Sequence, residues 1–184
     1  KLLFSTDGAD WTAYADGDGS DKIFSANNDT NTPVTNLLDD PVDTRHVRFV
    51  VQSFYNHICM RAEVLGCSIN NEETCSVQPS GMENAAANIT ASTVFPHCST
   101  AKALLNSQPS VRDDAVGGWG GGWCADFSDL SGSWLQVDLN SVTRIAGVIT
   151  QGRADYPQWV TSYNLSFSSD GAVWDTYSEQ GQEK

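Results

Sequence analysis

Cysteine and asparagine residues supply the first chemical signals in this sequence. Five cysteines are present, and no two stand in a Cys-x-x-Cys pair, so their spacing indicates neither a zinc site nor a thioredoxin-type motif. Disulfide formation explains them better. Three Asn-x-Ser/Thr sequons predict glycosylation at Asn28, Asn88 and Asn164. Cysteines and sequons together are typical of an oxidising compartment, so we expect an extracellular, secreted protein.

Histidines give weaker signals for a metal or a reaction. His57 lies two residues from Cys59, and His97 adjoins Cys98, but neither spacing matches a zinc motif. The chain has no Ser-His-Asp order with an elbow motif, and its Gly-Gly-Trp-Gly-Gly-Gly run lacks the Lys-Ser/Thr of a phosphate loop. We therefore expect no enzyme, no metal site and no cofactor.

One acidic segment offers calcium binding as a second interpretation. Residues 16–21 place Asp16 and Asp18 at alternate positions, as at the start of a calcium-binding loop. The EF-hand template, however, requires a glycine where Asp21 stands and a glutamate where Asn27 stands. The segment is therefore predicted to be a solvated exit from a hairpin.

Composition and charge limit the classes of partner. The formal net charge is −13 and the isoelectric point is near 4.3, whereas nucleic-acid binding requires a basic surface. The same charge disfavours anionic membrane lipid. Hydrophobic residues make up 40% of the chain, which is enough for a core. No apolar run approaches the roughly 18 residues of a membrane-spanning helix.

Alternation of apolar and polar residues predicts β-strands. In residues 45–51 the apolar side chains Val47, Phe49 and Val51 share one face. Similar patterns predict strands over 133–139, 143–151 and 162–168. Turn signals such as Asp40-Pro41 separate the apolar runs. Many short strands with turns between them predict an all-β antiparallel sandwich or jelly roll.

The two ends of the chain repeat one phrase. Residues 4–14 read FSTDGADWTAY and residues 167–177 read FSSDGAVWDTY, an ungapped match at an offset of 163. Over residues 2–14 against 165–177, eight of thirteen positions are identical. Each copy predicts a β-hairpin whose glycine supplies the positive φ of a tight turn. A period this long is a domain length rather than the length of a solenoid unit.

Longer stretches resemble a known family. The sequence SWLQVDLNSVTRIAGVITQGR followed by WVTSYNLSFSSDGAVW resembles the middle of a discoidin domain, also called the coagulation factor 5/8 type C domain. Residues 22–67 resemble its closing half and end on its last cysteine, and residues 75–93 resemble its opening and begin on its first. The resemblance implies an antiparallel jelly-roll β-sandwich of the discoidin, galactose-binding-like type.

The order of these parts is that of two out-of-phase halves. Residues 1–67 resemble the C-terminal half of one repeat, residues 68–74 a linker, and residues 75–184 the N-terminal and middle part of the next repeat. Two interpretations follow. The chain is a window from a tandem array, or it is a circularly permuted domain whose halves complement each other.

The repeated phrase makes one hairpin surplus in either interpretation. Residues 164–184 duplicate residues 1–21, so we predict that the Trp11 hairpin belongs to the sandwich and that the Trp174 hairpin lacks a partner. An unpaired β element is a liability unless something accepts it. Donation to a neighbouring copy by strand swapping would resolve the problem.

The resemblance also implies disulfides. In the family the first and last cysteines of a domain pair, so Cys67 and Cys75 need partners outside residues 1–184 unless the two halves dock and the two pair with each other. Among the remaining cysteines, Cys98 with Cys124 is one pair that we consider, and Cys59 with Cys124 is the alternative if the halves share one sandwich. The disulfide set expected from the resemblance is Cys67, Cys75, Cys98 and Cys124, and the connectivity stays open.

By position, the resemblance places a ligand site on loops at one end of the sandwich. These are residues 93–100, the glycine-rich segment around Trp119, and residues 152–158. Exposed aromatic rings there would stack on sugars, and an arginine would hydrogen-bond a polar group. The expected ligand-binding residues are Phe95, Trp119, Arg153 and Tyr156, and the tryptophans expected in the core are Trp123, Trp134 and Trp159.

Two functions from different classes follow from these observations. The first is a non-catalytic extracellular recognition or adhesion module that binds a glycan or a matrix protein through these loops. The second is a structural repeat of a self-assembling extracellular array or fibre, held by β-strand exchange between neighbouring copies. No nucleic-acid partner is expected. Membrane lipid is disfavoured, because the first loop is short and lacks paired tryptophans.

Overall fold

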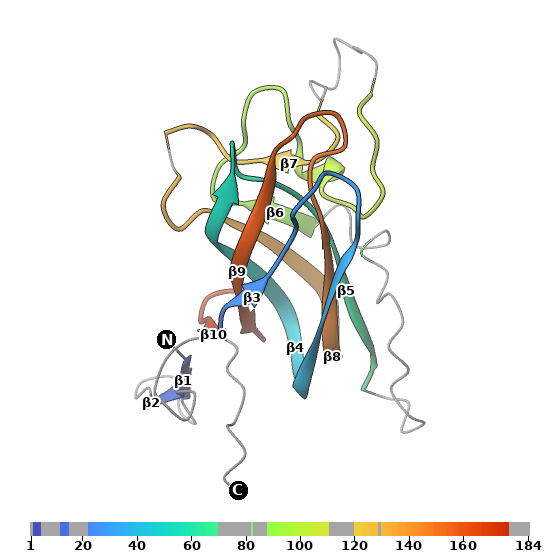
Figure 1. Cartoon of the computed structure of the whole chain (residues 1–184). Coiled ribbons are helices and arrows are strands. Elements are labelled where there is room, and N and C mark those ends of the chain that lie inside the picture. The colour runs from blue at the N-terminus through green and yellow to red at the C-terminus, as the bar shows by residue number, and fades with distance from the viewer. Residues whose placement is uncertain are drawn as a thin grey trace, which may run out of the picture.

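The structure is a computed structural model of the chain, shown in Figure 1. It describes residues 22–69, 82, 88–110, 120–128 and 130–176, and the backbone of residues 2–4 and 12–14. The elements in these ranges are β1 (Leu2–Phe4), β2 (Thr12–Tyr14), β3 (Phe24–Ser25), β4 (Val34–Tyr55), β5 (Cys59–Ser68), β6 (Ile89–Ala91), the 3-10 helix η2 (Thr100–Lys102), β7 (Trp123–Cys124), β8 (Trp134–Gln151), β9 (Trp159–Ser168) and β10 (Asp175–Thr176).

Two long strands, β4 and β8, determine the architecture. They pair antiparallel twice, with residues 34–44 of β4 opposite the C-terminal part of β8 and residues 46–50 opposite its N-terminal part. The register shifts between Leu37 and Val42 and again between Thr44 and His46. Such irregularities bend strands, so β4 and β8 pass from one layer of the sandwich to the other (Figure 1).

The described strands form two layers joined by β4 and β8. One layer contains β9, the second part of β4, the first part of β8 and β6. The other contains the first part of β4, the second part of β8, β5 and β7. The order in this 8-stranded sheet is β10-β9-β4-β8-β5-β7, with β3 on β9 and β6 on β8. The predicted all-β antiparallel sandwich is confirmed.

The core lies between these layers. Val47 and Phe49 are 0% exposed and Val51 is 5% exposed, as the alternation of residues 45–51 predicts. Tyr163 on β9 packs against Phe49 with ring centroids 5.5 Å apart. Its hydroxyl accepts a hydrogen bond of 3.0 Å from Asn36 Nδ2 on the first part of β4, so a polar contact also joins the two layers.

Strands from the two sequence segments alternate in one sheet. β4, from the segment 1–67, lies between β9 and β8, and β8, from the segment 75–184, lies between β4 and β5. The halves therefore build one hydrophobic core together. Their origin in two tandem repeats stays a prediction, and most of the predicted linker, residues 68–74, lies outside the described residues.

The prediction about the surplus hairpin is wrong for the folded chain. Residues 164–168 are part of β9, where Leu165 is 0% and Phe167 is 4% exposed, and β10 pairs with β9 in the large sheet. In the described part of the chain it is β1 and β2 that form a separate 2-stranded sheet. The reason is proximity, because β10 follows β9 after a short loop, which keeps the closure entropy small.

The predicted turn at Asp40-Pro41 is also wrong. Both residues lie inside β4, at the register shift between Leu37 and Val42. Proline has no N–H for a strand ladder and is tolerated where the pairing is irregular. The signal thus marks the bend of a long strand instead of the end of a short one.

Candidate functional site

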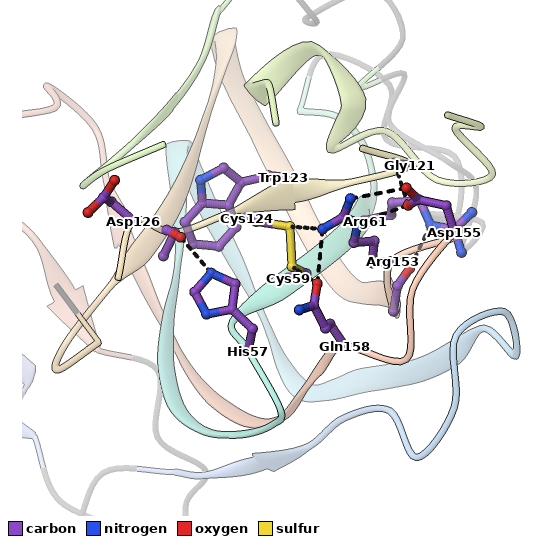
Figure 2. The surroundings of a disulfide bond; sticks show 12 residues. His57, Cys59, Arg61, Gly121, Trp123, Cys124, Asp126, Arg153, Asp155 and Gln158 are labelled. Atoms are coloured by element: carbon purple, nitrogen blue, oxygen red, sulfur yellow. Dashed lines mark hydrogen bonds and ion pairs between the residues drawn. A yellow bond between two sulfur atoms is a disulfide. The ribbon is translucent and has the colours of Figure 1, made fainter. Parts of the chain in front are cut away.

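The loops of one end of the sandwich meet around a disulfide between β5 and β7. We call this end, with residues 56–58, 93–99, 125–128 and 152–158, the loop end. Cys59 begins β5 and Cys124 ends β7, and the two are direct partners in the antiparallel pairing with their Cα atoms 4.1 Å apart. Both are 0% exposed. Figure 2 shows the bond between the side chains of His57, Arg153 and Gln158, which come from two different loops. This bond fixes the end of the sandwich where we expected the ligand site.

The prediction that Cys98 belongs to the disulfide set is wrong. Cys98 is a free thiol, 6% exposed, that packs against the Cys59–Cys124 bond, and burial raises its pKa to about 11. The alternative prediction, a bond between Cys59 and Cys124, is confirmed, because β5 and β7 from the two segments pair with each other. Cys67 is disulfide-bonded, and its expected partner Cys75 lies outside the described residues.

Arg153 lies inside the loop end, with 11% of its side chain exposed. Its Nε and one terminal nitrogen donate to the two carboxylate oxygens of Asp155 at 2.8 and 3.0 Å, and the other terminal nitrogen donates to Gln158 Oε1 at 2.9 Å (Figure 2). The Gly121 N–H also donates to Asp155, at 2.8 Å. Burial would raise the pKa of Asp155, but these hydrogen bonds outweigh it and hold that pKa below its usual range.

These contacts occupy the donors of Arg153 within the protein. The guanidinium also lies 5.1 Å from the centre of the Tyr156 ring, a cation–π distance. Arg153 therefore positions the loop that carries Tyr156, and it is not presented on the surface as the sequence led us to expect. Tyr156 itself is 60% exposed, in agreement with its predicted place at the surface.

Arg61 is a second internal arginine, which the sequence reading missed. It lies on β5, is 1% exposed, and donates to three loop carbonyls, of Gly152, Ser107 and Thr30, at 2.7 to 2.9 Å. A fourth bond of 3.1 Å reaches Asn31 Oδ1. Three separate loops are thereby tied to one strand. Two charged residues, Arg61 and Glu63, within the otherwise apolar residues 59–65 of β5 were the signal that could have revealed an internal arginine.

Aromatic rings form the surface beside the disulfide. Phe127 is 61% exposed and stacks on the buried His57 with ring centroids 4.2 Å apart. Phe95 meets Phe127 edge to face at 5.3 Å and packs against the cysteine cluster. Phe95 is half-buried, and its role in ligand binding stays a prediction; Phe127, which the sequence analysis did not single out, is the more exposed ring. Trp119 lies outside the described residues.

The three tryptophans expected in the core differ in how far they are buried. Trp123 is 0% exposed and confirms the prediction. Trp134 and Trp159 are only half-buried, and for them the prediction is wrong. Trp134 lies against Arg48, and Trp159 stacks on Tyr55 at 4.5 Å. Tyr55 is 49% exposed, so this pair adds a further aromatic surface at the loop end.

Acidification is expected to destabilise the loop end through His57. The residue is 2% exposed, and its Nε2 donates to the Ala125 carbonyl at 2.8 Å. Burial lowers the pKa of His57 from the ordinary value of 6.5. The unfolded chain thus takes up this proton at higher pH than the folded chain, so the free energy of unfolding should fall as the pH drops from 6.5 toward the folded pKa.

Urea unfolding at a series of pH values, with the wild type and the His57→Gln variant, measures this effect. The variant cannot titrate at this position and should show a shallower loss of stability on the acid side. Equal slopes for the two proteins below pH 6.5 would contradict the assignment.

The three sequons differ in accessibility. Asn28 is exposed and Asn88 is half-buried, with its amide donating to Asn140 Oδ1. Asn164 lies on β9 and is 6% exposed, which leaves no room for a glycan on the folded protein. Glycosylation at Asn28 and Asn88 stays a prediction.

Possible metal sites and membrane-spanning helices were searched for among the described residues. Among these residues no group of three or more histidine, cysteine, aspartate or glutamate side chains could hold a metal ion. The acidic segment 16–21, our second interpretation for calcium, lies outside them. No helix in the described part of the chain is long and apolar enough to cross a membrane.

Comparisons with known proteins agree with this architecture. Human EGF-like repeat and discoidin I-like domain-containing protein 3 is 34% identical over 197 residues, which cover 100% of this chain and 38% of that protein. Mouse lactadherin is 29% identical over 200 residues, covering 100% of this chain and 39% of lactadherin. The venom prothrombin activator pseutarin-C non-catalytic subunit of Pseudonaja textilis is 31% identical over 183 residues, covering 96% of this chain and 12% of the subunit.

The chain thus spans two fifths or less of the length of these relatives. No solved structure matches it. The relatives and the disulfide at the loop end confirm the predicted extracellular location. The family model described as F5/8 type C domain matches residues 1–64 and 88–184. The predicted resemblance is therefore confirmed, and the chain belongs to the F5/8 type C, or discoidin, domain family.

Proposed function

We propose that this chain is a non-catalytic recognition and adhesion module that binds a glycan or a matrix protein through the loop end. The observation that carries the proposal is the exposure of Phe127 and Tyr156, 61% and 60%, on loops held by buried internal bonds. Aromatic side chains give large contact area at low entropic cost. The name of the venom relative, a non-catalytic subunit, supports a role without catalysis.

The charge of the loop end favours a neutral ligand over an anionic one. Arg61 and Arg153 use their donors within the protein, and Lys102 donates to the Gln108 carbonyl at 2.9 Å. The whole chain carries a net charge of −13. An anionic lipid headgroup would need unengaged cations, whereas a sugar ring needs an aromatic face and hydrogen-bond partners.

Replacing Tyr156 or Phe127 by alanine is expected to weaken binding about tenfold or more, because central aromatic residues dominate recognition surfaces. The measurement is saturable binding of the full chain to arrays of glycans and matrix proteins. Val142→Ala is the matched control, since Val142 is 38% exposed on the part of β8 distant from the loops.

Two outcomes would count against the proposal. One is the absence of saturable binding on both arrays. The other is an equal loss of binding in the Val142→Ala variant, which would show that the effect does not belong to the loop end. Binding lost only on one array identifies the ligand class as glycan or as protein.

A further inference from the structure

The turn between β9 and β10 occupies a defined site on the outer face of the sheet. The Trp174 ring lies 3.8 Å from the Arg48 guanidinium carbon, and the Trp134 ring lies 4.2 Å from the same carbon. His46 meets Trp174 edge to face at 6.0 Å. We call His46, Arg48 and Trp134 the hairpin site. Its three residues are not among those proposed to bind the ligand.

A small set of residues gives the turn its shape. Gly171 has φ +77°, and a Cβ there would stand 3.3 Å from the His46 imidazole, so both conformation and space favour glycine. The Gly171 N–H donates to Ser168 Oγ at 2.8 Å, at the end of β9. Asp170 Oδ1 accepts the N–H groups of Ala172 and Val173 at 2.8 and 3.0 Å. Trp174 Nε1 donates to the Gly171 carbonyl at 3.2 Å.

The N-terminal phrase repeats the residues that make these contacts. Asp170, Gly171, Ala172 and Trp174 correspond at the offset of 163 to Asp7, Gly8, Ala9 and Trp11. The turn positions that differ are Ser169 and Val173, and both are exposed in the structure. The identical residues thus include the glycine that faces His46, the aspartate that accepts the turn's N–H groups and the tryptophan that lies on Arg48.

The strand register is repeated as well. β2 pairs with β1 through Phe4↔Thr12 and Leu3↔Ala13. β10 pairs with β9 through Phe167↔Asp175 and Ser166↔Thr176, the same pairs at the offset of 163. β2 therefore needs no change of register to lie beside β9 in place of β10. β1 already lies near β10 in the structure (Figure 1).

We propose that residues 6–14 are a second ligand for the hairpin site, able to replace residues 169–177 beside β9. The chain then carries one site and two segments with the groups to fill it. The ligand is a β-strand preceded by an Asp-Gly-Ala-x-Trp turn of the same chain, because β1 already contacts β10 within the chain. This goes beyond the recognition function and does not depend on it.

A double-mutant cycle on the full chain tests the proposal. If two equivalent segments compete, removing one reduces the statistical weight of the filled site only about twofold. Trp174→Ala and Trp11→Ala should therefore each shift the urea midpoint little. The double variant should lower it by clearly more than the sum of the single shifts. Arg48→Met removes the guanidinium that both segments would contact, together with its contacts to Trp134 and Gln136, and should lower the midpoint at least as far as the double variant.

Each outcome decides the question. If Trp174→Ala alone lowers the midpoint as far as the double variant, residues 6–14 do not fill the site and the proposal is wrong. The same holds if Trp174→Ala fails to fold. Sedimentation of Trp174→Ala over a range of concentrations separates the two sources. A constant monomer mass is expected for filling within the chain, and a concentration-dependent dimer, which indicates filling by a second copy, would contradict it.

Discussion

Removing the Cys59–Cys124 bond by the double substitution Cys59→Ala/Cys124→Ala is expected to lower the free energy of unfolding by about 4 kcal/mol. The bond joins residues 65 positions apart, and the entropy that such a crosslink removes from the unfolded chain has this magnitude. Chemical denaturation of both proteins measures the difference. The loss should be largest in the loops, because β7 has only two residues.

Cys98→Ala is the matched control for this prediction. Its thiol is buried and unbonded, so only a small packing loss of about 1 kcal/mol is expected. A loss as large as that of the double variant would indicate that Cys98, and not Cys59, holds Cys124. Peptide mapping of the intact protein gives the same distinction directly.

Replacing Arg61 by methionine is expected to lower the free energy of unfolding by about 3–5 kcal/mol. Methionine fills a similar volume, but the carbonyls of Gly152, Ser107 and Thr30 would lose their donor. Each buried acceptor left without a partner costs about 1–3 kcal/mol. Because these carbonyls belong to three loops, ligand binding at the loop end should fall in parallel with stability.

Arg61→Lys tests whether charge or geometry matters. Lysine keeps the charge but cannot present the planar fork that reaches four acceptors, so it should recover only part of the loss. Arg144→Met, at an exposed ion pair with Asp43, is the matched surface control and should have a much smaller effect. If Arg61→Met unfolds at the same urea concentration as the wild type, the hydrogen bonds from Arg61 to the three loops are not a source of stability.

The strands could be predicted because their pattern is local. Val47, Phe49 and Val51 alternate with polar residues, and a period of two places them on one face whatever the rest of the chain does. The same pattern could not show that residues 34–55 form one strand. Its bend at Pro41 depends on pairing with β8, which lies about a hundred residues away in sequence.

The candidate site was predicted less well, because it depends on contacts between loops. The exposure of Tyr156 was predicted correctly, since a loop with an aromatic residue is a local signal. The internal hydrogen bonds of Arg153 were not predicted, because Asp155 and Gln158 become its partners only when the loop folds back on itself. Phe127 was missed because its place beside His57 is created by packing between separate loops.

Residue identity, local alternation and repetition were enough to predict the family, the all-β class, the extracellular chemistry and a repeated hairpin sequence. The partner of Cys124 and the hairpin that lies on Arg48 could be assigned only from the folded chain. Both choices depend on which strands become neighbours. Strand neighbours are selected by burial and loop closure over the whole chain, and no local pattern of residues carries that information.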